Sequence, residues 1–113
     1  GRCMETFIKG DVVVLPFPFT DLSSAKRRPA LILSDITGDD YIMLQITSRN
    51  VSDTYAIPLT EADLVSGSLH LDSNIRPNKI FTLDQKIILY KIGHLSDEKL
   101  SECMDKVCSI INS

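Results

Sequence analysis

Two short stretches carry side chains suited to binding a phosphodiester and reacting with it. Lys26-Arg27-Arg28 forms a compact basic cluster that is followed directly by Pro29. Arginine presents a planar fork of donors that fits phosphate oxygens, so such a cluster can bind phosphate locally. Farther along the chain, Thr47-Ser48 offers two adjacent hydroxyl groups. Each feature has an ordinary structural explanation, a turn or a solvated charge, so a role in chemistry needs independent support.

The charge of the whole chain argues against a general affinity for nucleic acid. Twelve Lys and Arg residues stand against fifteen Asp and Glu residues, which gives a formal net charge of −3. A basic field over the entire surface is therefore excluded. Any phosphate binding must be local, with a modest dependence on salt.

No set of residues is spaced for a metal site. The chain has two histidines, His70 and His94, and three cysteines, Cys3, Cys103 and Cys108. Five residues along a predicted helix separate Cys103 from Cys108, so their side chains diverge by roughly 140° and share neither a disulfide nor a metal. We expect buried thiols, structural histidines, and a protein that needs no metal or other cofactor.

Length and composition are typical of one globular domain. The 113 residues are 43% hydrophobic and 24% charged, with five glycines and five prolines. We expect a single domain over residues 1–113, with 1–8 as an N-terminal extension or cloning remnant. The apolar run at residues 12–15 is too short to cross a bilayer, and no secretory signal opens the chain, so a cytoplasmic location is expected.

Several short strands must position the chemical groups. Apolar and β-branched stretches bounded by proline, glycine or polar residues predict strands. These stretches cover residues 11–17, 29–34, 41–47, 54–59 and 73–81. Pro77 interrupts the last of them, which predicts an edge or bulged strand. Thr60 predicts the N-cap of a helical turn over 60–65, and residues 83–95 fit either a buried strand or a short helix before a strand.

The C-terminal segment predicts an amphipathic helix. Ser96 is a good N-cap, and Asp97 and Glu98 place negative charge in the first turn, where the helix dipole favours it. Apolar residues then recur with helical spacing and form one stripe. They are Leu100, Cys103, Met104, Val107, Cys108 and Ile111. Strands followed by one such helix predict a mainly β fold, a small curled antiparallel sheet capped by helices.

Five stretches in fixed order resemble a family signature. They read KGDVVVLPF at 9–17, RRPALILS at 27–34, ITS at 46–48, FTLD at 81–84 and IGHLS at 92–96. In this order and spacing, from about Lys9 to Ile110, the sequence resembles the PemK/MazF family of toxin endoribonucleases from toxin–antitoxin modules. The resemblance implies an SH3-like barrel of about five to seven strands with short helices and an amphipathic C-terminal helix, usually as a homodimer.

The resemblance also implies an activity and partners. Family members cleave single-stranded RNA, often mRNA, at short sequences without a metal ion. A cognate antitoxin inserts an extended, flexible tail along the RNA groove and blocks it. No membrane partner is implied.

Individual roles follow from the resemblance. Arg28 matches the family's arginine before proline, which stabilises the phosphate, and Thr47 matches its functional threonine. Arg76 matches an arginine that some relatives pair with an aspartate two residues later. Here Asn78 occupies the aspartate's position, and a neutral amide cannot accept the 2′-hydroxyl proton as a base. Phe81 stands where relatives more commonly carry an arginine.

We therefore predict Arg28, Thr47 and Arg76 as the catalytic residues. The predicted substrate-binding residues are Asp21, Lys26, Arg27, Ser48, Asn78 and Lys79. Asp21 is the loop carboxylate that can act as base or orient Arg28, and a turn-forming role fits it equally well. The general base stays unassigned.

Aromatic residues add a weaker prediction. Phe17, Phe19 and Phe81 have rings that can stack on RNA bases. Core packing is the favoured role for at least two of the three.

Three functions stay open at this level. The first is an active, sequence-selective endoribonuclease toxin, which Arg28, Thr47 and Ser48 favour. The second is a catalytically weak or silent barrel that binds only RNA or an antitoxin peptide, which Asn78 and Phe81 favour. The third is a gyrase-poisoning toxin of the same fold, although the C-terminal end offers no tryptophan-type anchor for a protein target.

Overall fold

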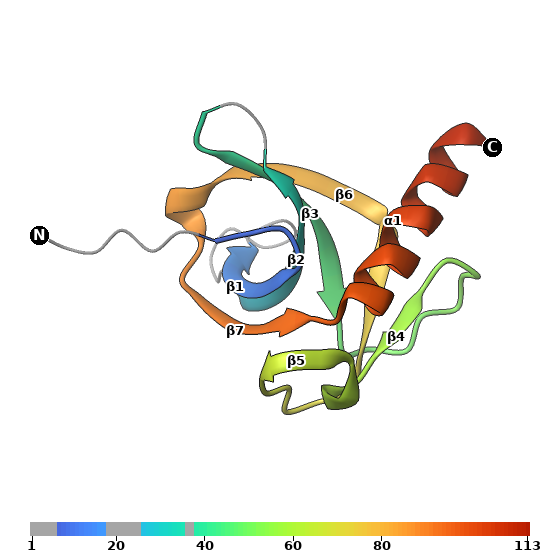
Figure 1. Ribbon diagram of the computed structural model, residues 1–113, viewed down its shortest axis with the longest axis horizontal. Helices are drawn as coiled ribbons and strands as arrows, with labels where there is room; N and C mark the ends of the chain where they lie inside the picture. The colour runs from blue at the N-terminus through green and yellow to red at the C-terminus, as the bar shows by residue number, and fades with distance from the viewer. Residues whose placement is uncertain (1–6, 18–25, 36–37) are drawn as a thin grey trace, which may run out of the picture.

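A curled antiparallel sheet with one C-terminal helix forms the molecule (Figure 1). The computed structural model describes residues 7–17, 26–35 and 38–113. Its elements are β1 (Asp11–Phe17), β2 (Lys26–Asp35), β3 (Asp40–Thr47), β4 (Ile57–Leu59), the 3₁₀ turn η1 (Glu61–Asp63), β5 (Leu64–Gly67), β6 (Ser73–Asp84), the 3₁₀ turn η2 (Gln85–Ile87), β7 (Tyr90–Leu95) and α1 (Asp97–Asn112). The predicted mainly β fold is confirmed.

The sheet has seven strands in the order β4-β6-β3-β2-β1-β7-β5, and each neighbouring pair is antiparallel. Its register shifts in four pairs, which are β1–β7, β2–β3, β3–β6 and β5–β7. Such irregularities bend strands and increase their twist, which lets the sheet curl. In β6 the partner of Gln45 is Arg76 while that of Leu44 is Ile80, so residues 77–79 have no partner in β3. The bulge predicted at Pro77 is confirmed.

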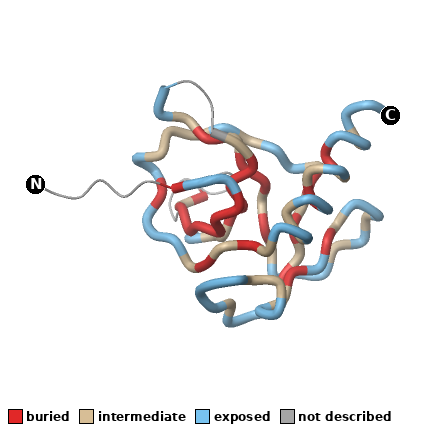
Figure 2. Tube along the Cα trace, viewed as in Figure 1, coloured by how far each residue is buried: buried red, intermediate tan, exposed pale blue. Residues whose placement is uncertain are grey.

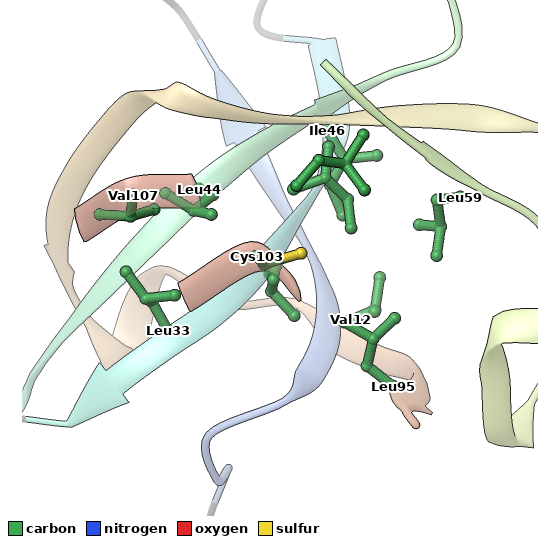
Figure 3. Packing of buried hydrophobic residues seen from close by; sticks show 11 residues of the cluster. Val12, Leu33, Leu44, Ile46, Leu59, Leu95, Cys103 and Val107 are labelled. Atoms are coloured by element: carbon green, nitrogen blue, oxygen red, sulfur yellow. The ribbon is translucent and has the colours of Figure 1, made fainter. Parts of the chain in front are cut away.

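Curling gives the sheet two apolar clusters, one on each face. Val12 lies in one cluster and Val13 and Leu15 in the other, because successive side chains of β1 point to opposite faces. Figure 2 shows β1 and its neighbours as the largest buried part of the trace. In Figure 3, Cys103 and Val107 of α1 lie among side chains of the sheet. The helix therefore covers one face of the sheet.

Helix α1 begins where its cap predicts. Ser96 has an extended backbone, and its side chain accepts a hydrogen bond from the N–H of Lys99 (3.2 Å). Asp97 and Glu98 stand in the first turn. The hydrogen bond from Lys99 to Ser96 satisfies one of the unpaired N–H groups at the start of the helix.

The apolar stripe of α1 is only partly covered. Cys103 and Val107 are buried, and Leu100 and Met104 pack against the same cluster. The prediction is wrong for Cys108, which is exposed, and for Ile111, which is 67% exposed. The last turns of α1 extend beyond the sheet (Figures 1 and 2), so no strand is there to cover them.

Burial distinguishes the two described thiols. Burial raises the pKa of Cys103 to about 12, and the nearby charge of Glu102 adds to the rise. The expectation of buried thiols holds for Cys103 and fails for Cys108, while Cys3 lies outside the described residues.

Two predicted elements are shorter than expected. The strand predicted over 54–59 is confined to β4, because the N–H groups of Tyr55 and Ala56 bond to the Asp53 side chain (3.0 and 3.1 Å) instead of to a strand. The helical turn after Thr60 ends at Asp63, since the chain then pairs with β7 as β5. Residues 83–95, ambiguous in sequence, complete β6 and form η2 and β7.

A buried carboxylate holds the start of β1. Asp11 is 1% exposed; its side chain accepts a hydrogen bond from the N–H of Ile8 (2.9 Å) and lies 2.8 Å from His94 Nδ1. Gly10, with φ of +97°, lies against the ring, because a Cβ there would stand 2.9 Å from His94 Cε1. The structural role expected of His94 agrees with these contacts.

No helix in the described ranges is long and apolar enough to span a membrane.

Candidate active site

A cavity of about 330 Å³ opens at one end of the sheet. Its lining comes from β1, β2, β3, β6 and β7 and from the segment 69–71 that precedes β6. Val14 and Ile46 supply buried apolar surface. Polar groups come from Arg27, Arg28, Thr47, Ser48, His70, Ser73 and Tyr90. An apolar base with a few polar groups around it is the usual form of a small-molecule or substrate site.

Strand order explains why residues distant in sequence share this cavity. β2 lies between β1 and β3 and is antiparallel to both, so its first residues lie beside the last residues of its neighbours. Arg28, near the start of β2, pairs with Leu15 of β1. Thr47 is the last residue of β3, and Ser48 follows it directly. The predicted residues Arg27, Arg28, Thr47 and Ser48 are thereby brought to one cavity.

Thr47 combines a local structural bond with a place in the cavity. Its hydroxyl oxygen accepts a hydrogen bond from the N–H of Arg49 (3.2 Å), which is the turn expected after a strand. A hydroxyl that accepts one bond still has its hydrogen to donate. The side chain can therefore hold the turn and contact a phosphate oxygen.

Arg76 and Asn78 lie away from this lining and meet at Asp53. Arg76 Nη2 donates to Asp53 Oδ2 at 2.7 Å, and Asn78 Nδ2 lies 3.5 Å from the same oxygen. Within the described residues, Arg76 Nε and Asn78 Oδ1 are buried and have no hydrogen-bond partner. The structure thus ties β6 to the loop between β3 and β4 at this point.

Asp53 is ionised more readily than a free aspartate. Desolvation raises its pKa, but the hydrogen bond from Arg76, the N–H groups of Tyr55 and Ala56, and the charge of Arg76 together lower it below the ordinary value. The sequence reasoning did not single out Asp53. Its only local signal is an acidic residue followed by a turn.

The other predicted residues are dispersed. Lys26 begins β2 and is exposed, and Lys79 is exposed in the bulge of β6; neither lines the cavity. Asp21 and Phe19 lie outside the described residues. Phe17 and Phe81 meet edge to face with ring centres 5.3 Å apart and join a core cluster. The core-packing role predicted for two of the three phenylalanines is confirmed.

The sequence reasoning missed three polar lining residues, which are His70, Ser73 and Tyr90. The sequence predicts a structural role for His70, yet this residue is exposed and lines the cavity. Tyr90, the first residue of β7, lines it as well and is 44% exposed. Nothing in their spacing to Arg28 or Thr47 signals this, because the sheet alone brings them together. Across the part of the chain that the structure describes, no three His, Cys, Asp or Glu side chains gather into a metal-binding set.

Comparisons with solved structures agree with the fold. An endoribonuclease in complex with its cognate antitoxin, from a mycobacterial species, superposes with a TM-score of 0.75 at 13% identity over 95% of this chain and 96% of that one. MazF of a MazE–MazF crystal structure from Deinococcus radiodurans gives 0.73 at 21% identity, over 93% and 95%. Mycobacterium tuberculosis toxin MazF-mt6 gives 0.70 at 16% identity, over 90% and 96%.

The assignment of the chain to a family rests on its amino-acid sequence. A search of curated proteins gave no match. The family model described as PemK-like, MazF-like toxin of type II toxin–antitoxin system matches residues 8–111, nearly the whole chain. The match covers β1 to α1, including every residue named in the cavity. The chain therefore belongs to the PemK-like, MazF-like family of type II toxin–antitoxin toxins.

Proposed function

We propose that this protein is a toxin that cleaves single-stranded RNA, including mRNA, at short sequences and without a metal ion. The observation that carries the proposal is the meeting of Arg27, Arg28, Thr47 and Ser48 around one cavity. Family membership supports the same reading, since solved structures with this fold include mycobacterial endoribonucleases.

The proposed cleavage reaction uses the 2′-hydroxyl of the ribose as its nucleophile. The 2′-hydroxyl attacks the adjacent phosphorus, and the phosphorane that forms carries an additional negative charge. Donors placed around that charge lower the barrier most effectively where water is excluded. Arg28 is half-buried at the cavity and offers two parallel N–H donors to the phosphate oxygens. The hydroxyl of Thr47 supplies a further donor.

Substrate binding extends beyond the reacting phosphate. Ser48 and the exposed Arg27 lie at the same cavity and would contact neighbouring phosphates or sugars. Lys26 and Lys79 are exposed and available for the RNA backbone farther along. Asp21 stays a predicted binding residue as the carboxylate of the polar stretch before the basic cluster, and it lies outside the described residues. Arg76 and Asn78 would act on RNA only by exchanging their contacts with Asp53.

Partners follow from the relatives. Solved structures similar to this chain include an endoribonuclease with its cognate antitoxin and a MazE–MazF structure. We propose, on the family resemblance, that this toxin is a homodimer in the cytoplasm and is inhibited by an antitoxin whose extended tail occupies the cavity.

The test is a cleavage assay. Purified protein is incubated with a long synthetic single-stranded RNA in excess EDTA, beside Arg28→Ala purified identically. We expect discrete fragments with 2′,3′-cyclic phosphate or 3′-phosphate and 5′-hydroxyl ends from the wild type, and none from the variant. Because Arg28 belongs to neither apolar cluster, the variant should unfold at a temperature close to that of the wild type. Equal cleavage by Arg28→Ala would end its assigned role.

A silent barrel is the second candidate. The contacts that Arg76 and Asn78 make with Asp53, away from the cavity, favour it. Intact RNA across a panel of sequences, together with measurable RNA or antitoxin-peptide binding, would establish this alternative.

A further inference from the structure

We propose that His70 is the general base of the cavity, the group that removes the proton from the 2′-hydroxyl. The inference rests on the proposed function and assigns the one role that the family resemblance left without a residue. Its support comes from the lining of the cavity, the fixed position of the segment that carries His70, and the chemistry of the polar groups present.

Among the described residues of the lining, one side chain is able to take a proton near neutral pH. Among the described residues around the cavity there is no carboxylate. Arginine stays protonated, neutral serine and threonine hydroxyls are too weakly basic to take a proton, and tyrosine gives up its proton only well above neutrality. Imidazole is the side chain that changes charge between about pH 5 and 8. His70 is the histidine in the lining.

Two carboxylates outside the cavity have other partners. Asp11 is buried against His94, and Asp53 is paired with Arg76. Asp72 is exposed two residues after His70 and does not line the cavity. Neither these three carboxylates nor any other Asp or Glu of the described residues lines the cavity.

The segment that carries His70 is held on both sides. The N–H of Ser68 donates to the carbonyl of Ile92 (3.1 Å), and the N–H of Leu69 donates to Glu61 Oε1 (3.3 Å). On the other side, Ser73 Oγ donates to the carbonyl of Leu71 (2.9 Å). A base must stay within hydrogen-bond reach of its proton, and these bonds keep the backbone of the segment at the cavity.

The imidazole itself is available to a ligand. His70 is exposed, and its ring makes no hydrogen bond to another of the described residues. By contrast, the ring of His94 is engaged with the buried Asp11. The two histidines of the chain therefore differ in how available their rings are to a ligand. His70 lines the cavity, whereas the ring of His94 contacts Asp11.

In the proposed step, a ring nitrogen of His70 takes the 2′-hydroxyl proton while the 2′-oxygen forms its bond to phosphorus. The bond between phosphorus and the 5′-oxygen breaks, and that oxygen takes a proton from water. The products are a 2′,3′-cyclic phosphate and a 5′-hydroxyl, and the imidazolium returns its proton to solvent. Arg28 and Thr47 hold the phosphate oxygens throughout.

A pH–rate profile in EDTA tests the assignment. The wild type should cleave faster as the pH rises from 5 to 8, because a neutral imidazole is the active form. His70→Gln should lose this rise and lower kcat at pH 7.5 by about 10²–10⁴-fold, the usual worth of a general base. Its KM should change little. The charged and titratable side chains that share the described lining with His70 are Arg27, Arg28 and Tyr90.

The other histidine provides the matched control. His94→Asn places an amide nitrogen where Nδ1 contacts Asp11, and it should keep the rise with pH. A further arm adds free imidazole to His70→Ala, which should recover part of the lost rate, an effect that a merely structural role would not produce.

The outcomes separate the two proposals. If the wild type cleaves no RNA, the proposed endoribonuclease function fails. If the wild type cleaves and a folded His70→Gln keeps both its rate and its rise with pH, the assignment of His70 is overturned while the function stands. Loss of the rise in His94→Asn instead would likewise overturn it.

Discussion

At the scale of single residues, Arg28 and Arg76 have different surroundings, although both were predicted as catalytic from the sequence. Arg28 lies half-buried at a cavity beside Thr47 and Ser48. Arg76 donates to Asp53 at 2.7 Å and lies outside the cavity lining. An arginine already paired with a carboxylate must break that contact before it can bind phosphate. Arg28 is therefore the better candidate for the reacting phosphate, and Arg76 for holding a loop.

The pairing of Asp53 predicts a loss of stability in acid. Because the pKa of Asp53 is lowered by folding, the unfolded chain binds that proton more readily than the folded one. The contribution of Asp53 is present above its ordinary value of 3.8 and is lost as the pH falls through the lower folded value. We expect the free energy of unfolding to fall more steeply below about pH 4 in the wild type than in Asp53→Asn.

Urea unfolding at a series of pH values from 7 to 2 measures this difference. Asp105→Asn, a change at an exposed position of α1, is the matched control and should keep the wild-type slope. Parallel curves for the wild type and Asp53→Asn would mean that the contact with Arg76 does not stabilise the fold.

At the scale of elements, the close approach of β5 and β7 sets the position of the segment that carries His70. Gly67 has φ of +85°, and a Cβ there would stand 2.1 Å from the Ile92 carbonyl oxygen. A Cβ on Gly93 would stand 2.7 Å from the Ser66 carbonyl oxygen. The two backbones meet only because both positions lack a side chain. The next residue, Ser68, then bonds to Ile92.

Gly67→Ala should therefore destabilise the fold far more than a positive φ alone would. At Gly38, with φ of +95°, an added Cβ would have no described atom within 4 Å, so Gly38→Ala isolates the conformational cost, about 1–2 kcal/mol. We expect Gly67→Ala to lose about 2–5 kcal/mol, since the backbone of β7 must also move. Urea denaturation measures both variants. Equal losses of unfolding free energy in the two variants would show that β5 accommodates the added methyl group without further strain.

At the scale of the whole molecule, charge is distributed unevenly. The formal net charge is −3, yet Lys26, Arg27 and Arg28 begin β2 without an intervening acid. The acidic residues Asp97, Glu98, Glu102 and Asp105 lie instead along one face of α1. RNA should consequently be attracted to the start of β2 and repelled from that face of the helix.

The salt dependence of RNA binding tests this arrangement. Three cations that each neutralise one phosphate of a single strand predict a slope of about −2 in a plot of log affinity against log salt. Arg27→Ala should reduce the slope by about 0.7, while Lys106→Ala on α1 should leave it unchanged. Fluorescence anisotropy with a 2′-O-methyl RNA, which cannot be cleaved, supplies the affinities. A slope unaffected by Arg27→Ala would place the binding surface elsewhere.

Local physics made several elements predictable from sequence. β1, β3 and α1 follow from apolar patterning, from proline and glycine boundaries and from the cap at Ser96, all of which act over a few neighbouring residues. β2 was predicted from residue 29, but it begins at Lys26, so Pro29 lies inside the strand. The bulge at Pro77 follows from a missing N–H. Arg28 and Thr47 could be singled out because the family signature surrounds them.

Tertiary structure alone decided the remainder, because it depends on partners that are distant in sequence. Register with β7 made β5 a strand and ended the turn at Asp63, and the limited reach of the sheet left Cys108 and Ile111 uncovered. The arrangement of the strands places His70 at the cavity, whereas Arg76 is paired with Asp53 outside the cavity lining. The sequence by itself determined a mainly β domain and singled out Arg28 and Thr47 as candidates; packing across the sheet determined which side chains accompany them, since such contacts have no signature in local spacing.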